Sequence, residues 1–260
     1  MIYVQNVFKA FGEKKVLQGA TLHCPRGESM VIIGGSGTGK SVLIKHMIGL
    51  LEPDSGTVTV DGQVVSKLKE DDLNELRKKF GMLFQSGALF DSLTVAENVA
   101  FPLREHTKMT DSKILKRVRE CLDMVGMPDI EENTPDELSG GMRKRVGLAR
   151  AIVMNPEIIL FDEPTTGLDP VMADVINDLI MKTTRALNVT SVTITHDMVS
   201  ANRIADKIAM LYQGEIIAVG TPDDIMFHQE NEVVKKFVEI GRIIRQTEAV
   251  KGRDIKDMHS

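Results

Sequence analysis

The sequence has little cysteine and no long apolar run, and both absences exclude classes of protein. The apolar runs, such as 30–33 and 158–161, have only the length of a strand, whereas a membrane-spanning helix needs about 20 mostly apolar residues. We therefore expect that the chain does not cross a bilayer by itself. Cys24 and Cys121 lie far apart and outside any CxxC pair, which argues against a disulfide framework and a cysteine zinc site. We predict that both are packing cysteines.

An excess of one charge is also missing. The 260 residues include 32 lysines and arginines and 37 aspartates and glutamates, which leaves a formal net charge of −5. This balance provides no strongly basic surface for duplex nucleic acid, so no nucleic-acid partner is expected. The first residues form an alternating and then charged segment that lacks the features of a signal peptide. The expected location is therefore the cytoplasm.

Apolar runs and helical patterns alternate along much of the chain, which is typical of an α/β fold. Hairpin-like segments near the N-terminus, the last with an Asp61-Gly62 turn, predict a smaller antiparallel β-layer beside the main sheet. Helical patterns dominate between residues 90 and 155, and we interpret this region as a helical insertion. The predicted strands are 2–8, 16–24, 29–33, 57–65, 157–161 and 190–195, and the predicted core helices are 40–50 and 171–186.

A glycine-rich loop with the pattern G-x-x-x-x-G-K-[ST] joins the strand at 29–33 to the helix that follows it. Free backbone N–H groups in such a loop, together with the positive end of the helix, form a concavity that fits a polyphosphate. Lys40 would place its charge at the β- and γ-phosphates, and the Ser41 hydroxyl would bind Mg²⁺. The predicted nucleotide-binding residues of this loop are Gly34, Gly35, Ser36, Gly37, Thr38, Gly39, Lys40 and Ser41.

Two acidic residues follow the apolar strand at 157–161. The carboxyl end of a central parallel strand faces the ligand in an α/β sheet. Asp162 would hold Mg²⁺ through its water shell, and Glu163 would orient or deprotonate an attacking water. The same residues also suit a turn that caps a helix, but the phosphate-binding loop in the same chain favours the catalytic interpretation.

A second candidate anion site is the segment Ser139-Gly140-Gly141, which precedes a basic helical stretch. Ser139 is a good N-cap, and the glycines leave the end of the helix open to an anion. Taken alone, this motif indicates an ordinary capped helix. The chain then has two anion-binding helix ends but one acid pair, so the second end would serve a phosphate held by another copy.

Together these motifs resemble those of the ATP-binding cassette (ABC) ATPases, over residues 1 to about 240. Five motifs follow the order of the family, at 34–41, 85, 138–142, 159–164 and 194–197. The resemblance implies an α/β fold of the P-loop NTPase type, a RecA-like core with an antiparallel β-subdomain and a helical insertion at about 90–155. It also implies hydrolysis of MgATP by a homodimer, in which each ATP lies between the loop of one copy and the Ser-Gly-Gly of the other.

The resemblance further implies roles for single residues. Gln85 would sense and bind Mg²⁺, Asp169 would cross the dimer seam, and Phe11 would stack on adenine. From the residues alone, Phe11 could equally belong to the core, and a solitary histidine after a strand, as His196 is, is more often structural. In the family, the histidine at this position contacts the γ-phosphate. The implied catalytic residues are Glu163, His196 and Lys40.

The absence of further sequence features excludes several branches of the family. There is no heptad run, no cysteine zinc module and no second cassette, which excludes the relatives that hold chromosomes, repair DNA or act in translation. The segments 84–99 and 138–152 resemble ATPases that work with MCE-domain proteins in bacterial phospholipid transport, which maintains the lipid asymmetry of the outer membrane. Met142 stands where most of the family has glutamine and cannot make the hydrogen bonds of that side chain; we interpret it as a trait of this branch.

The MCE-associated branch implies a set of partners. These are integral-membrane permease subunits, a periplasmic MCE-domain subunit, a small cytoplasmic accessory subunit and phospholipid as cargo. The chain would lie peripherally on the cytoplasmic face of the bacterial inner membrane. The alternative is an ATP-driven clamp that signals through a membrane partner without moving a substrate.

Two segments keep open interpretations. The apolar residues 88–90, beside Gln85, either form a hydrophobic patch that receives a short permease helix or are buried inside the insertion. Residues 241–260 are a polar C-terminal extension that is either disordered or docked on a neighbouring subunit, and the apolar Ile243 and Ile244 favour docking.

Overall fold

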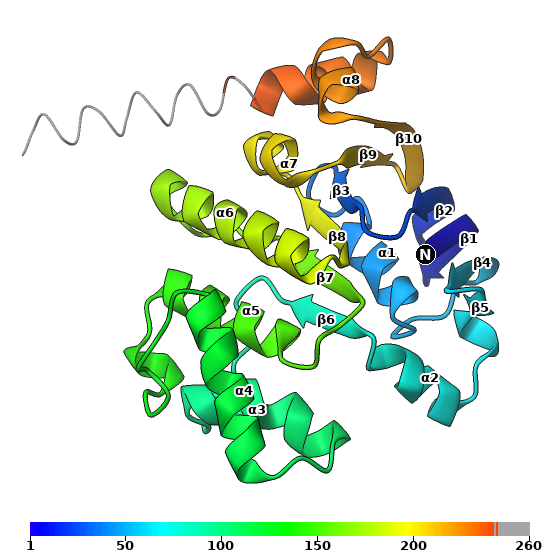
Figure 1. The fold of residues 1–260 in the computed structure, drawn as a ribbon. Coiled ribbons are helices and arrows are strands. Elements are labelled where there is room, and N and C mark those ends of the chain that lie inside the picture. Colours follow the sequence, from blue (N-terminus) through cyan, green and yellow to red (C-terminus); the bar gives the residue numbers. More distant parts are fainter. Residues whose placement is uncertain (242, 244–260) are drawn as a thin grey trace, which may run out of the picture.

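The computed structural model describes residues 1–241 and 243. It contains a six-stranded sheet in the order β10-β9-β3-β8-β7-β6 and a four-stranded sheet in the order β2-β1-β4-β5, with helices around them (Figure 1). Strands β9, β3, β8, β7 and β6 run parallel, and β10 is antiparallel to β9. The bounds are β1 (Ile2–Phe11), β2 (Lys14–Cys24), β3 (Ser29–Ile33), β4 (Ser55–Val60), β5 (Gln63–Val64), β6 (Phe80–Leu83), β7 (Ile158–Asp162), β8 (Thr190–Thr195), β9 (Lys207–Tyr212) and β10 (Glu215–Gly220).

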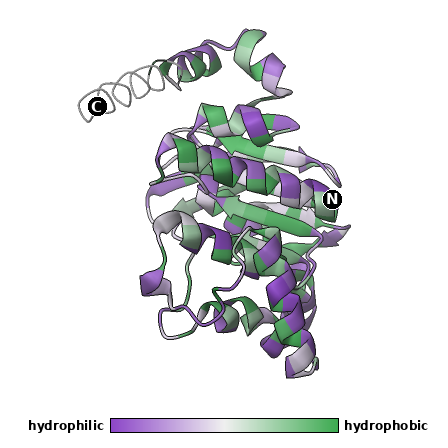
Figure 2. Ribbon diagram, turned by 60° about the vertical axis from the view of Figure 1, so that its left-hand side comes forward, coloured by the Kyte–Doolittle hydropathy of each residue, from purple (hydrophilic) through white to green (hydrophobic). Residues whose placement is uncertain are grey.

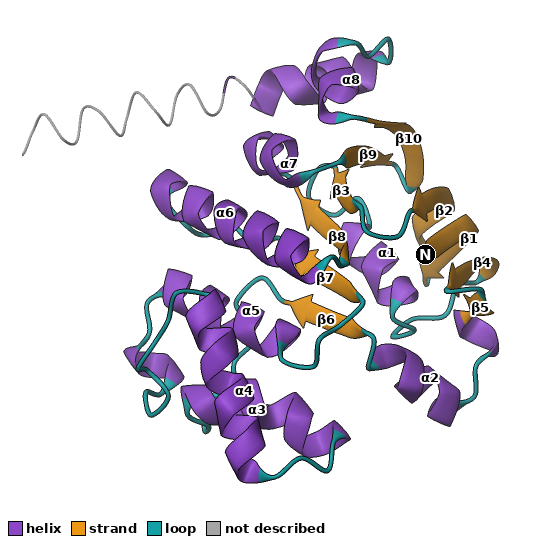
Figure 3. Cartoon of the chain, in the orientation of Figure 1, coloured by secondary structure: helices purple, strands orange, loops and turns teal. Residues whose placement is uncertain are grey.

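Helices cover the six-stranded sheet and form a separate group beside it (Figure 3). Short 3-10 helices lie at Val65–Lys67 and Pro135–Glu137, and a last helix covers 232–241. None of the helices in the described part of the chain combines the length and apolar character needed to cross a bilayer. The α-helices are α1 (Lys40–Met47), α2 (Glu70–Arg77), α3 (Val95–His106), α4 (Asp111–Met124), α5 (Gly140–Ile152), α6 (Pro170–Leu187), α7 (Met198–Ile204) and α8 (Pro222–Phe227).

Strand β3 carries apolar side chains on both faces because both of its faces are covered. In β3, Met30 and Ile32 belong to the hydrophobic cluster that holds α1 and the four-stranded sheet. Val31 and Ile33 belong to the opposite cluster, which holds α5, α6 and α7. Side chains alternate along a strand, so a strand buried on both faces has a continuous apolar run. The hydropathy colouring shows this run in the central sheet (Figure 2).

The predicted α/β core with a small antiparallel layer is confirmed. The four-stranded sheet is antiparallel, and Val60 pairs with Gln63 across the predicted Asp61-Gly62 turn. The helix predicted at 40–50 was too long, because α1 ends at Met47. Gly49 has φ +68 there, and its N–H donates to the carbonyl of His46. A glycine with positive φ just after a helix satisfies its last carbonyls and stops it.

Helices α3, α4 and α5 pack on one another in the segment between β6 and β7. Helix α3 begins with a capping box, in which Thr94 and Glu97 bond each other's backbone N–H groups. The domain bounds 1–240 and 90–155 stay predictions. Most of the predicted extension, residue 242 and residues 244–260, lies outside the described residues.

Both cysteines are buried, as predicted. Burial raises the pKa of the Cys24 thiol to about 12 and that of the Cys121 thiol to about 11. A thiol reacts as its thiolate, so both residues are inert packing groups at neutral pH.

Candidate functional site

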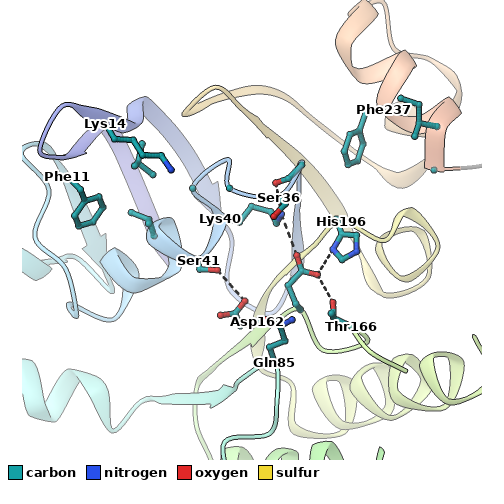
Figure 4. Close-up of a pocket in the computed structure, with 18 residues that line it drawn as sticks. Phe11, Lys14, Ser36, Lys40, Ser41, Gln85, Asp162, Thr166, His196 and Phe237 are labelled. Atoms are coloured by element: carbon teal, nitrogen blue, oxygen red, sulfur yellow. Dashed lines mark hydrogen bonds and ion pairs between the residues drawn. The ribbon is translucent and has the colours of Figure 1, made fainter. Parts of the chain in front are cut away.

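A cavity of about 970 Å³ lies beyond the carboxyl ends of β3, β7 and β8 (Figure 4). Its walls include the glycine-rich loop after β3, Asp162 and Glu163 at the end of β7, and His196 after β8. Parallel strands present their carboxyl ends at one edge of the sheet, where ligands of α/β proteins bind. The topology therefore joins three of the predicted motifs in one place.

The glycine-rich loop, residues 34–41, depends on its glycines. Gly39 is the N-cap of α1 with φ +105, and a Cβ there would lie 3.0 Å from Val16. A Cβ on Gly34 would collide with the backbone carbonyl of Leu211. Side chains at these positions would force the loop away from β9 and β2, so the sequence requires glycine to bring the backbone this close.

Lys40 lies at the mouth of this loop with only 6% of its surface exposed. Its Nζ donates to the carbonyl oxygens of Gly34 at 2.8 Å and Gly35 at 3.0 Å, and lies 3.4 Å from Oε1 of Glu163. These contacts fix a positive charge beside the open N-terminus of α1. Both features favour an anion at the same point.

Glu163 follows β7 directly and has a positive φ of 49°. This region is uncommon for a residue with a side chain, and non-glycine residues in it cluster at functional sites. Its Oε2 accepts hydrogen bonds from Thr166 Oγ1 at 3.1 Å and from His196 Nδ1 at 2.9 Å. Because a carboxylate only accepts, Nδ1 of His196 carries the proton in this bond. The Glu163 carboxylate is thus held between these side chains and Lys40.

Asp162 and Ser41 form a pair of oxygen donors on the other side of the cavity. Ser41 Oγ donates to Oδ1 of Asp162 at 3.4 Å. Burial raises the pKa of the Asp162 carboxyl, and the charge of Glu163 raises it further. A carboxylate that is partly desolvated beside a hydroxyl fits a hard cation such as Mg²⁺, which would compensate its charge. Gln85, the third predicted Mg²⁺ ligand, lines the same cavity.

Phe11 lies on the cavity wall and not in the core. Its side chain is 48% exposed, and Lys9 Nζ lies 5.7 Å from its ring centroid. An exposed ring at the edge of an anion site suits stacking on a base. The structure therefore excludes the core position, and stacking on adenine stays a prediction.

Ser139 and Asp169 do not line this cavity. Ser139 is the N-cap of α5 and accepts a hydrogen bond from the N–H of Met142 at 3.3 Å, while Asp169 is the N-cap of α6. Ser139 and Gly140 are exposed, and Gly141 is buried. One chain thus holds the loop and acid pair in one cavity and the Ser-Gly-Gly outside it.

Met142 has a packing role that its position in the motif did not indicate. Its side chain is partly buried and packs against the hydrophobic cluster that includes α3, α4 and α5. The side chain thus contributes apolar contact to the first turn of α5.

Several residues of the site were not predicted. Thr166 bonds Glu163, and the helix at 232–241 contributes Phe237 and Ile240 to the cavity wall. Nothing in the sequence near 237 indicates this long-range contact. Lys144 on α5 bonds the loop after Glu163, and its spacing of three and four residues from the buried Gly141 and Leu148 does signal an inward position.

Comparison with known proteins agrees with this arrangement. A family model described as ABC transporter matches residues 17–166. The chain is 43% identical over 242 residues to "Probable ribonucleotide transport ATP-binding protein mkl" of Mycobacterium leprae (strain TN), covering 93% of this chain and 70% of that protein. It is 40% identical over 235 residues to "Intermembrane phospholipid transport system ATP-binding protein MlaF" of Haemophilus influenzae, covering 90% and 89%.

A solved structure has the same fold. The dimeric structure of a post-hydrolysis state of the ATP-binding cassette MJ0796, bound to ADP and Pi, superposes with a TM-score of 0.78 at 34% identity, over 85% of this chain and 99% of that chain. The family match at 17–166 includes the glycine-rich loop, Gln85, the Ser-Gly-Gly segment and the acid pair. This chain belongs to the family of ABC transporter ATPases.

Proposed function

We propose that this chain is the ATP-hydrolysing subunit of a complex that transports phospholipid between membranes, and that it acts as a homodimer. The observation that carries the ATPase role is the Glu163 carboxylate, which Lys40, Thr166 and His196 hold inside the nucleotide cavity. The cargo is supported by the likeness to MlaF, whose name specifies phospholipid and whose length this chain matches over 89%.

The loop at 34–41 binds the phosphates of ATP through backbone N–H groups and the N-terminus of α1. Lys40, already oriented by two carbonyl oxygens, supplies the charge for the β- and γ-phosphates. Phe11 stacks on the adenine at the far end of the cavity. Together these contacts bind, orient and neutralise the nucleotide before any chemistry.

Asp162, Ser41 and Gln85 hold Mg²⁺ in this proposal. When bound, the ion neutralises charge on the β- and γ-phosphate oxygens. Glu163 lines the same cavity as Asp162 and is the carboxylate that accepts a proton from water that attacks the γ-phosphate. Thr166 and His196 keep its Oε2 in place while this happens.

His196 acts first as a positioning group for Glu163. In the neutral ring the one N–H is on Nδ1, so Nε2 can only accept a hydrogen bond. A ring with a second proton would offer an Nε2–H donor to the γ-phosphate while it keeps its bond to Glu163. The neutral tautomer with its N–H on Nε2 would offer the same donor but would give up the bond to Glu163.

Dimerisation completes the site. Ser139, Gly140 and Gly141 at the exposed end of α5, and Asp169 at the start of α6, serve the nucleotide of a second copy. The likeness to the dimeric MJ0796 supports this arrangement.

A membrane permease docks on the aromatic patch formed by Phe90 and Phe101. These rings are 44% and 39% exposed and their centroids lie 4.9 Å apart. The buried Asn98 holds the loop under them, because its side chain accepts from Phe90 N–H at 2.8 Å and donates to the Phe90 carbonyl at 3.1 Å. Ala88 is exposed and Leu89 is half-buried, so the segment 88–90 is only partly inside the insertion. A periplasmic MCE-domain subunit and a small cytoplasmic accessory subunit complete the complex, and this chain lies on the cytoplasmic face of the bacterial inner membrane.

The cargo is tested by purifying the complex from native membranes through a tag on this chain. We expect enriched phospholipid by mass spectrometry, with ATP-dependent release that Glu163→Gln blocks. A complex that instead carries ribonucleotides, as the name of the mycobacterial relative specifies, would contradict the cargo but not the ATPase. A lipid-free complex that alters a periplasmic enzyme would favour signalling.

A further inference from the structure

Lys144 is a buried cation outside the predicted set of site residues. It lies on α5, five residues after the N-cap Ser139, and only 5% of its surface is exposed. Its Nζ donates to the carbonyl oxygen of Pro164 at 2.6 Å and to that of Thr166 at 2.7 Å. Both carbonyls belong to the loop that follows Glu163, so this side chain joins α5 to that loop within one copy.

The catalytic loop, residues 163–166, is fastened on its other side to α7. Thr165 Oγ1 lies 3.2 Å from Ser200 Oγ, and Asn177 Nδ2 donates to the same oxygen at 2.9 Å. Helix α7 begins two residues after His196, which itself bonds Glu163. The loop is therefore held between α5 and α7, and the position of Glu163 depends on both helices.

The buried position of Lys144 carries a desolvation penalty for its positive charge. Burial lowers its pKa to about 8, although the nearby Glu163 carboxylate opposes this shift. A long apolar side chain would fill the same space without this desolvation penalty. The cation instead bonds two carbonyls that no apolar group could satisfy, and both carbonyls belong to the three residues that follow Glu163, the residue with a positive φ.

We propose that Lys144 is a positioning residue that transmits the occupancy of the Ser139 end of α5 to Glu163 of the same copy. This inference rests on the proposed function, in which that end binds the nucleotide of the second copy. A phosphate bound at Ser139 shifts α5 and with it Lys144. Lys144 in turn fixes the position of the loop that carries Glu163. Each of the two ATP sites of the dimer thereby controls the catalytic base of the other.

The test compares Lys144→Met and Lys144→Arg in the full chain, with Lys116→Met as the control, because Lys116 is an exposed lysine on α4. We expect Lys144→Met to lower kcat at least about tenfold and to change the affinity for ATP less than about threefold. This is the loss of about one charge-assisted hydrogen bond. Lys144→Arg keeps two donors and should restore at least half of the rate.

Thermal unfolding separates positioning from folding. A Lys144→Met protein that unfolds with the native midpoint but turns over slowly supports the proposal. Wild-type kcat in Lys144→Met overturns it. An equal loss of kcat and of unfolding midpoint in both the Met and Arg variants also overturns it, because the role would then be structural.

The link to Ser139 is tested by a double-mutant cycle on kcat with Ser139→Ala. Two residues on one path give effects on kcat that do not multiply. The kcat of the double variant should therefore lie within about threefold of the kcat of the slower single variant. Independent, multiplying effects would overturn the link. Glu163→Gln distinguishes the failures: if that variant hydrolyses ATP normally, the proposed function has failed, whereas if it is inactive and Lys144→Met is normal, only this inference has failed.

Discussion

The two helices that begin with an anion-binding end, α1 and α5, are built in opposite ways. Helix α1 starts inside a walled cavity, with a buried lysine and two carboxylates beside it. Helix α5 starts with the exposed Ser139 and Gly140, and its own basic side chain Lys144 points back into the protein. In the proposed function, the first end provides the charge and the chemistry, and the second provides backbone N–H groups for a nucleotide held by a second copy. Variants at the two ends should therefore fail in different ways.

The largest loss of activity is expected in the cavity at the N-terminal end of α1, where Glu163 lies. Glu163→Gln removes the proton acceptor and keeps the shape of the side chain, so kcat should fall by about 10² to 10⁴. ATP should still bind, because the loop and Lys40 are intact. Steady-state hydrolysis and nucleotide titration measure the two quantities. A rate within a factor of a few of the wild type would show that another group is the base.

Lys40→Ala should weaken binding itself. Charge-assisted hydrogen bonds contribute about 1.5 to 3 kcal/mol, so the affinity for ATP should fall by about one to two orders of magnitude. Equilibrium titration of the full chain with a fluorescent ATP analogue measures this loss. An unchanged affinity would contradict the role of the loop, and adenosine serves as a control that lacks the phosphates.

Ser139→Glu should have the opposite effect to Lys40→Ala, because it should impair dimerisation and hydrolysis but not the binding of ATP to the monomer. The added negative charge repels a phosphate at the end of α5, so ATP-dependent dimerisation and kcat should fall at least about tenfold, the effect of about 1.4 kcal/mol. Binding of ATP to the monomer should not change, because Ser139 lies outside the cavity. Light scattering with and without ATP follows the dimer. Weaker binding to the monomer would show that the two ends are not separate sites.

The smallest effect concerns His46 at the far end of α1. Its ring is buried, Nδ1 donates to the Val42 carbonyl, and burial lowers its pKa despite that bond. Lys9 lowers the pKa further, whereas Asp54 opposes this shift. The unfolded chain then binds this proton at a higher pH than the folded chain, so stability should be lost as the pH falls from about 6.5 through the folded pKa.

His46→Leu removes that titration. We expect the thermal midpoint of this variant to change less between pH 7 and pH 5 than that of the wild type. The two changes should differ by about a few degrees at most. Differential scanning calorimetry measures the two curves, with the exposed His228→Leu as a control. Parallel curves for His46→Leu and the wild type would show that His46 does not titrate in this range.

Local motifs were sufficient to predict much of the molecule. The glycine pattern at 34–41 and the acid pair at 162–163 each depend on neighbours in the chain, and both lie where the pattern indicated. The Ser139 cap was also predicted, because capping is a contact over three residues. The end of α1 was missed, although Gly49 with its positive φ is a local signal for the stop.

Contacts between distant segments could not be derived in this way. The exposure of Phe11, the packing of Met142 and the bonds from Lys144 to the loop after Glu163 depend on which elements come together. The spacing of residues along the chain does not predict these contacts. Lys144 and Pro164, for example, are separated by 20 residues.

The sequence by itself therefore determined the family, the nucleotide loop and the acid pair, because each is written in consecutive residues whose backbone or charge acts locally. Only the tertiary structure decided that the carboxylate of Glu163 is held by Lys40 and His196, and that the end of α5 lies outside this cavity. The physical reason is that parallel strands bring their carboxyl ends together across the sheet, whatever their distance along the chain.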